Sequence, residues 1–332
     1  MIKIDGSKGE GGGQILRTSL SLSAITGKEI LIEKIRAGRE KPGLKRQHLT
    51  CVKAVAEICS AEVSTVEVGA SSLEFKPGQI KGGDYHFNIG TAGSVTLVAQ
   101  TIIPILLMAK TPSRVTITGG THVSFAPTWD FFSECYLPEI RRMGANVEAS
   151  LESYGFSPAG GGKITLSITP FDNSSRNKNY SLIELGEFKG GTITGVVSDI
   201  KRKIAETEVE IVFRRLSDLI LGKEIQEVES VGPGNYCIAK LLYERASVVF
   251  SSIGCMGRSR KTVANEIVHA VQKFVKSKKA CESHLADQLL LPYCVFVLGG
   301  INYLNPNELE WLSIQEKSLH FTTNMDVICL FK

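Results

Sequence analysis

The segment Gly9-Glu-Gly-Gly-Gly-Gln14-Ile-Leu-Arg17, together with the residues on either side of it, decides the fold. Residues 2–5 alternate apolar and polar side chains as a strand does, and the glycine loop follows them. The pattern then predicts a helix from Gln14 to Thr26 and a strand from Glu29 to Ile35. The chain therefore begins with a strand, a glycine loop, a helix and a second strand.

The same order of elements recurs at an offset of about 80 residues. Tyr85 to Ile89 is strand-like, and a second glycine loop follows in Gly90-Thr-Ala-Gly93-Ser. Val95 to Ala109 predicts a helix, and Arg114 to Thr118 a strand. A recurring order at a fixed offset indicates an internal repeat.

The second halves of the two copies also correspond. A helix from Gln47 to Ser60 leads to a hairpin ending at Phe75, and a helix from Trp129 to Met143 leads to a hairpin ending near Ile168. A partial third copy is predicted at 285–329, with a helix from Leu285 to Leu298 and strands at 308–314 and 318–329. We therefore predict an α+β fold of three βαβαβ-type repeats.

A different pattern occupies the region between about 180 and 280, after a polar linker at 171–180. It predicts a small α+β module with a strand at 191–197, a helix at 201–221, strands near 223–229, 236–243 and 246–253, and a helix at 261–277. The predicted domains are thus 1–183 with 279–332, and an inserted module at 184–278.

The inserted module carries no motif that the sequence connects with chemistry. We expect it to lie outside the chemical centre and to assist capture of an anionic ligand or subunit contact through a basic surface. That surface is formed by Arg202, Lys203, Arg214, Arg215, Arg258, Arg260 and Lys261.

Composition sets broad limits. The 332 residues are 43% hydrophobic and carry a net charge of +4, which is too weak alone to indicate nucleic-acid binding. Eight scattered cysteines, several inside apolar runs, are typical of reduced thiols in a cytoplasmic protein. The N-terminus shows no signal-peptide pattern. The longest apolar run, Val95 to Ala109, is shorter than the roughly 20 residues of a membrane span, so we expect a buried helix and no membrane association.

The first glycine loop matches neither the P-loop nor the dinucleotide fingerprint, because no Gly-Lys-Ser/Thr follows and Gln14 stands where the third glycine belongs. Its backbone N–H groups could cradle phosphate, Glu10 could hold Mg²⁺ and Arg17 could bind a phosphate with both guanidinium nitrogens. A glycine turn required only for tight packing is the equally open alternative.

Residues 34–48 contain six Lys/Arg, and Lys45 and Arg46 fall at the start of a helix. Cations there oppose the helix dipole, which favours binding of polyphosphate or of an RNA backbone over a solvated charged loop. Three further residues remain ambiguous on position alone. Gln100 either points into a site or bonds to backbone groups freed by Pro104. Asp287 is in a position typical of a helix cap. His320 is a lone histidine on a strand-like run.

Taken together, these segments resemble RNA 3′-terminal phosphate cyclase over essentially the whole chain, and least within the insert. The motifs that carry the resemblance are Gly9–Arg17, Ile35–Arg39, Lys41–Leu44, Arg46–Leu49, Gly82–Tyr85, Gly90–Ser94, Ala126-Pro127, Pro158–Gly162, Leu285–Leu289, and His320 with Thr323-Asn324. The resemblance implies three repeats like the C-terminal domain of translation initiation factor 3, related to the enolpyruvyl transferases, with a small inserted domain.

The resemblance also implies an ATP-dependent enzyme that converts an RNA 3′-phosphate to a 2′,3′-cyclic phosphate through a covalent histidine–AMP intermediate. It assigns the nucleophile to His320 and an Mg²⁺ or Mn²⁺ ligand to Glu10. The implied adenylate pocket comprises Gln100, Pro127, Asp287 and Gln288, with His284 where family members often carry tyrosine. The implied phosphate and RNA contacts are Arg17, Arg36, Arg39, Arg46, Gln47 and His48.

The resemblance leaves two alternatives and one further expectation. A non-catalytic relative that binds RNA in ribosome assembly is the main alternative, although the presence of His320, Glu10 and Arg17 together argues against it. An enolpyruvyl transferase rests on fold alone. Familiar members continue for about another strand pair beyond Lys332, so we expect an open sheet edge that could form contacts in a homodimer.

Overall fold

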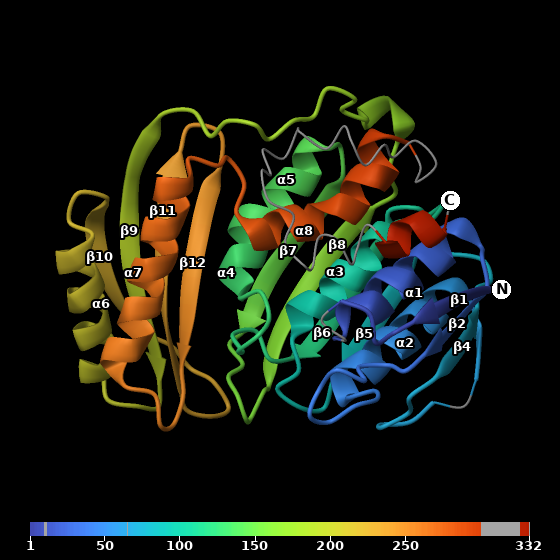
Figure 1. Cartoon of the computed structure of the whole chain (residues 1–332), viewed down its shortest axis with the longest axis horizontal. Helices are drawn as coiled ribbons and strands as arrows, with labels where there is room; N and C mark the ends of the chain where they lie inside the picture. The colour runs from blue at the N-terminus through green and yellow to red at the C-terminus, as the bar shows by residue number, and fades with distance from the viewer. Residues whose placement is uncertain (10–11, 65, 300–325, 332) are drawn as a thin grey trace.

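The computed structural model describes residues 1–9, 12–64, 66–299 and 326–331. These residues form a mixed α/β structure with three four-stranded sheets (Figure 1). Figure 1 places two of the sheets and their helices on one side of the molecule and the third sheet with its two helices on the other.

The first sheet has the order β1-β2-β4-β3. Its strands are β1 (Ile2–Asp5), β2 (Ile30–Glu33), β3 (Glu62–Val63) and β4 (Leu73–Lys76). β1 and β2 are parallel, and β4 is antiparallel to both of its neighbours. The helices α1 (Gln14–Thr26) and α2 (Arg46–Cys59) complete this part. The predicted bounds of α1 are confirmed, because Gly13 and the left-handed Gly27 delimit it.

The second sheet has the corresponding order β5-β6-β8-β7 and the same pattern of parallel and antiparallel pairs. Its strands are β5 (Asp84–Asn88), β6 (Ser113–Gly119), β7 (Asn146–Ser153) and β8 (Gly162–Thr169). Its helices are α3 (Val95–Leu106) and a continuous helical stretch of α4 (Trp129–Phe131), the π-helix η1 (Phe132–Tyr136) and α5 (Leu137–Arg142). α3 is buried on nearly every side, as its apolar composition predicts.

The third sheet has the order β10-β9-β11-β12. Its elements are β9 (Phe188–Ser198), α6 (Lys203–Arg215), β10 (Ile220–Glu227), β11 (Gly234–Tyr243), β12 (Ser247–Gly254) and α7 (Arg260–Ser277). This part has a hydrophobic core of its own, drawn from residues between Leu185 and Ala280, whereas the first two sheets share one core with α8 (Ser283–Pro292). The π-helix η3 (Tyr293–Val297) follows α8.

Some predicted boundaries are wrong. The helix expected at 201–221 ends at Arg215, because Leu216 leaves helical geometry and Ile220 already enters β10. Residues 326–330 are helical, although a strand was expected to continue to 329. Val327, Ile328 and Phe331 are buried there, a spacing that fits one face of a helical turn. The other predicted strand of the third copy, at 308–314, lies outside the described residues.

Two general features follow from the described residues. All eight cysteines are free thiols, six of them buried, as expected from their apolar surroundings. Within the described part of the chain, no helix has the length and apolar character needed to cross a membrane.

Candidate active-site cleft

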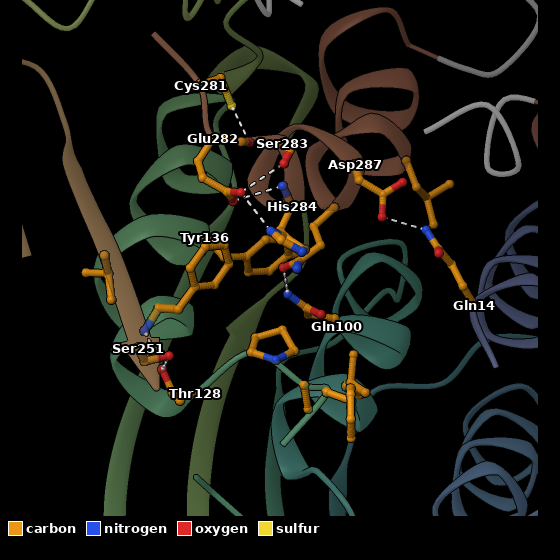
Figure 2. A pocket seen from close by; sticks show the side chains of 18 of the residues that line it. Gln14, Gln100, Thr128, Tyr136, Ser251, Cys281, Glu282, Ser283, His284 and Asp287 are labelled. Atoms are coloured by element: carbon orange, nitrogen blue, oxygen red, sulfur yellow. Dashed lines mark hydrogen bonds and ion pairs between the residues drawn. The ribbon is translucent and has the colours of Figure 1, made fainter. Parts of the chain in front are cut away.

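A cleft of about 1040 Å³ lies where α1, α3, the loop before α4, β12, α7 and α8 approach one another (Figure 2). A volume of this size suits a nucleotide or a somewhat larger ligand. Seven of the residues that the sequence singled out line it, namely Arg17, Arg39, Gln100, Pro127, His284, Asp287 and Gln288. The cleft thus joins side chains of α1 and the basic segment, of α3 and the loop before α4, and of α8.

Helix α8 begins earlier than the sequence predicts, and Asp287 does not cap it. The cap is Glu282, whose carboxylate accepts hydrogen bonds from the backbone N–H groups of His284 (2.8 Å) and Leu285 (3.2 Å). Glu282 Oε1 also lies 2.7 Å from His284 Nδ1. Burial opposes ionisation of Glu282, but the bonds from His284 lower its pKa. An acid just before an apolar helical run is the signal that could have identified this cap.

Asp287 instead bonds to another helix. Its carboxylate, 8% exposed, accepts a 2.6 Å hydrogen bond from Gln14 Nε2 at the start of α1 (Figure 2). Burial lowers the pKa of Arg17, and the nearby Asp287 and Cys51 partly offset that effect. An arginine stays protonated under these conditions, so Arg17 presents a positive charge to the cleft.

Gln100 points into the cleft instead of toward backbone freed by Pro104. Its side-chain amide bonds the amide of Gln288 on α8 (Figure 2). Near the start of α3, Thr96 Oγ1 donates a 2.7 Å hydrogen bond to Pro127 O. α3 therefore holds both the amide pair and the proline that borders the cleft.

Gly12 and Gly13 are packed closely against cationic and imidazole side chains. A Cβ added at Gly12 would lie 2.9 Å from Arg39 Nη2, and one at Gly13 would lie 2.1 Å from His48 Nε2. The absence of side chains therefore lets Arg39 and His48 reach the loop. Close packing therefore requires glycine at these two positions. Phosphate binding would require the same short distance between the backbone and these side chains.

His48 is neutral in this position. Its Nδ1 accepts a hydrogen bond from the Lys45 backbone N–H at 3.2 Å, which leaves the proton on Nε2, facing Gly13. Burial, with help from Arg17, Arg36 and Lys45, lowers the pKa of His48 to about 3. The side chain can therefore donate a hydrogen bond without adding charge.

The other residues of the basic segment lie outside the cleft lining. Arg36, which is buried and has a φ of 54°, donates to Lys41 O and Gly43 O at 2.8 Å each and so holds the loop that presents Arg39. Burial, with the repulsion of Arg39, lowers the pKa of Arg36. Gln47 Oε1 accepts a 2.8 Å bond from the Ser94 N–H at the start of α3. Arg46 is exposed beside Gly90.

Two central predictions lie outside the described residues. Glu10, the expected metal ligand, and His320, the expected nucleophile, both fall there. Their roles stay predictions.

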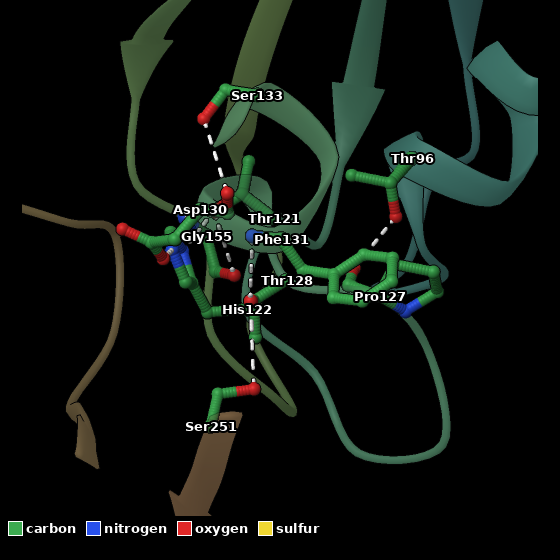
Figure 3. A network of polar contacts seen from close by, with 10 residues as sticks. All are labelled: Thr96, Thr121, His122, Pro127, Thr128, Asp130, Phe131, Ser133, Gly155 and Ser251. Carbon is green, nitrogen blue, oxygen red and sulfur yellow. Dashed lines mark hydrogen bonds and ion pairs between the residues drawn. The ribbon is translucent and has the colours of Figure 1, made fainter. Parts of the chain in front are cut away.

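The part of the structure built on the third sheet with α6 and α7, called the module below, forms one wall of the cleft, which the sequence did not predict. The wall consists of Val249, Phe250 and Ser251 on β12 and Ala270, Lys273, Phe274 and Ser277 on α7. No motif marks these residues, since their role depends on how the third sheet packs. Thr128 Oγ1, at the start of α4, donates to Ser251 Oγ at 3.5 Å (Figure 3).

A buried histidine holds the module against the rest of the protein. His122 has no exposed surface; Thr121 Oγ1 lies 2.8 Å from its Nδ1 and Asp130 Oδ2 lies 3.0 Å from its Nε2 (Figure 3). Its ring stacks on Tyr236 of β11 with centroids 4.2 Å apart. Burial, reinforced by Asp130, raises the pKa of Tyr236 well above its usual value, so that phenol stays protonated.

Comparisons with known proteins point to one family. The model of the RNA 3′-terminal phosphate cyclase family matches residues 8–332. A protein of Koribacter versatilis named RNA 3′-terminal phosphate cyclase is 43% identical, over 100% of this chain and 90% of its own. Its namesakes from Ectopseudomonas mendocina and Salmonella agona are 42% and 39% identical, each over 99% of this chain and over 94% and 91% of their own. The family predicted from the motifs, with its enzyme class, is confirmed: this chain belongs to the RNA 3′-terminal phosphate cyclase family.

Proposed function

We propose that this protein uses ATP to convert an RNA 3′-terminal phosphate into a 2′,3′-cyclic phosphate. The observation that carries the proposal is the convergence of two arginines and five predicted nucleotide contacts on one cleft. Membership of the cyclase family supports the same reaction. Neither observation concerns the chemical intermediate, which we infer from the resemblance of the motifs.

The lining divides by chemistry into a base region and a phosphate region. Pro127 and His284 offer an apolar ring and a planar imidazole against which an adenine can stack, and the bonded amides of Gln100 and Gln288 line the same cleft. Arg17 and Arg39 supply the cationic forks that suit phosphate oxygens. Neutral His48, beside both the loop and Arg17, is placed to donate a further hydrogen bond.

The reaction proceeds in three displacements. A ring nitrogen of His320 attacks the α-phosphorus of ATP, the bond to the β-phosphate oxygen breaks and pyrophosphate leaves. An oxygen of the RNA 3′-phosphate then attacks the same phosphorus and releases the histidine. Finally the 2′-oxygen, having lost its proton, attacks the activated 3′-phosphorus and AMP leaves. Ring closure is favoured because nucleophile and target share one ribose.

The charge on the phosphates must be offset in each displacement. Arg17 and Arg39 do this within the described cleft. Glu10 would hold an Mg²⁺ or Mn²⁺ ion through its carboxylate, and that ion would supply further positive charge to the phosphate oxygens. The contribution of Arg36, Arg46 and Gln47 to binding of the RNA end is part of the same proposal.

We also infer the finer organisation that the sequence predicts. The shared strand order of the first two sheets supports two copies of one repeat, and α8 would begin the third. The separate core of the third sheet supports an inserted module. A homodimer and a cytoplasmic location stay predictions.

The test uses ATP labelled at the α-phosphate, Mg²⁺ and a denaturing gel. The wild-type protein should become labelled through a bond that is labile in acid and stable in alkali, and His320→Asn should not. With RNA bearing a 3′-phosphate, the product should resist phosphatase. A substrate whose last sugar is 2′-deoxy should stop at the adenylated RNA end, because it lacks the attacking oxygen. Label retained by His320→Asn would rule out that nucleophile, and no label in any form would favour the non-catalytic RNA-binding alternative.

A further inference from the structure

The wall of the cleft that the module contributes is not used by the proposed reaction. It carries positive charge in Lys273 on α7 and in Lys279, just after that helix. Lys276 and Lys278 belong to the same segment, which leads directly into α8 (Figure 1). None of these four lysines forms an ion pair with a carboxylate in the described part of the chain.

Four of the seven basic residues that the sequence assigned to the surface of the module meet carboxylates. Arg202 pairs with Glu206 (3.3 Å) and with Glu227 (2.7 Å). Carboxylates likewise pair with Lys203, Arg214 and Arg258. Arg215 and Lys261 form no ion pair with a carboxylate among the described residues, so the module keeps unpaired positive charge both at the cleft and elsewhere.

The helix dipole accounts for only part of this lysine cluster. A cation in the last turn of α7 is favoured by the partial negative charge there, and Lys276 occupies that turn. Lys273 lines the cleft from the preceding turn, and Lys279 lies beyond the left-handed residue Lys278 that ends the helix. A ligand with negative charge in the cleft explains both placements.

A second, independent feature of the same cleft is Phe125. It lines the cleft yet is fully exposed, at 106%, and its φ is 61°, a region that side chains other than glycine rarely adopt. The loop that carries it is fixed at both ends, by His122 bonded to Asp130 and by Pro127 O bonded to Thr96 (Figure 3). The aromatic ring is thus held out toward solvent by a firmly anchored loop.

An exposed aromatic ring and unpaired lysines along one cleft are the elements with which proteins bind single-stranded RNA. Bases stack on the ring, and ammonium groups follow the phosphates. We propose that Phe125, Lys273 and Lys279 form a track for the nucleotides that precede the 3′-terminal one. The inference rests on the proposed function, because it places the terminal phosphate in the part of the cleft near Arg17.

The experiment measures binding of fluorescein-labelled RNA of about eight nucleotides, a length within the range of single-strand sites, with a 3′-phosphate and without ATP. Anisotropy titrations at several salt concentrations give the affinity and its salt dependence. Lys273→Gln with Lys279→Gln should weaken binding about fivefold to tenfold, since each exposed ion pair contributes modestly. The slope of log affinity against log salt should become shallower by about 1.4, or about 0.7 for each lost phosphate contact.

Phe125→Ala should weaken binding about fivefold or more, since stacking on an aromatic ring is favourable for any base, and should leave the salt slope unchanged. RNA with abasic sugars before the last nucleotide should bind Phe125→Ala and wild type equally. Lys261→Gln, at the opposite end of α7, and Met256→Ala, an exposed apolar residue of the module, are the matched controls and should bind as wild type.

Three results would overturn the track. The first is a loss of RNA affinity in Lys261→Gln equal to that in the lysine pair, and the second is an equal loss of affinity for a single nucleoside 3′-phosphate and for the longer RNA. The third is competition by poly-L-glutamate as strong as by unlabelled RNA, which would assign the lysines to an acidic protein. Adenylation by labelled ATP, assayed separately, tests the proposed function. Absent adenylation with intact lysine- and length-dependent RNA binding would refute the chemistry and support the track.

Discussion

Asp287 on α8 accepts a hydrogen bond of 2.6 Å from the side-chain amide of Gln14 on α1, although 273 positions separate the two residues in the chain. This bond fastens the helix that follows the third sheet to the helix that follows the first glycine loop. Both residues line the cleft, so the contact sets the distance between its two sides.

Asp287→Ala should lower the free energy of unfolding by about 1–2 kcal/mol, because it removes the acceptor of a partly buried hydrogen bond. Urea denaturation measures the change. In the Asp287→Ala background, Gln14→Ala should cost less than it does in wild type, as expected for two residues in contact. The exposed Asp218→Ala serves as control and should be neutral. Additive effects of the two substitutions would contradict the coupling.

Gly13→Ala should destabilise the protein by about 1–3 kcal/mol, because the new methyl group must displace the His48 imidazole from a position only 2.1 Å away. The backbone of Gly13 has a φ of −81°, so strain of the main chain does not contribute. Gly222→Ala, whose methyl group would meet Thr192 at an ordinary 3.4 Å, is the matched control. Equal stability of the two variants would show that His48 moves freely.

The neutral His48 predicts a loss of stability in acid. Its pKa is about 3 in the folded state against an ordinary 6.5, so between these values the unfolded chain binds more protons and unfolding becomes easier as the pH falls. From pH 6.5 to 5 the loss should be about 2 kcal/mol. His48→Gln keeps an acceptor for the Lys45 N–H, and its free energy of unfolding should fall less between pH 6.5 and 5. Exposed His269→Gln should follow the wild type.

Glu208 predicts the opposite trend. Burial raises its pKa to about 7, and its carboxylate accepts bonds of 2.9 Å and 3.1 Å from Asn235 Nδ2. The folded protein therefore binds the extra proton, and its contribution is present below pH 4.5 and is lost as the pH rises through 7. Relative to Glu208→Gln, the wild type should lose up to about 3 kcal/mol over this range. Unfolding titrations of both forms, with exposed Glu224→Gln as control, measure the difference.

Most of the helices and strands could be predicted from the sequence, because the spacing of apolar residues and the positions of glycines determine them within a few residues. The bounds of α1 and the strands of the first two sheets followed from those signals. Three features of the cleft did not. Glu282 was missed as the cap because Asp287, an acid five residues later, was expected in that position.

The other two features depend on tertiary packing. The bond between Gln14 and Asp287 and the wall formed by β12 and α7 join segments far apart in the chain, and no local pattern encodes such contacts. Tertiary packing also decides which basic residues of the module remain without an ion pair. A count of arginines and lysines cannot show which of them meet a carboxylate, as Arg202 does with Glu206 and Glu227.

The arrangement of the cleft also determines when it can exist during synthesis. Gln14 leaves the ribosome early, but its partner Asp287 follows 273 residues later, after the whole third sheet. At about 5–20 residues per second, this interval lasts roughly a quarter of a minute to one minute. Throughout it, the glycine loop and α1 must remain without the helix that completes their surroundings. The nascent protein therefore stays unable to complete this cleft until residue 287 has been made.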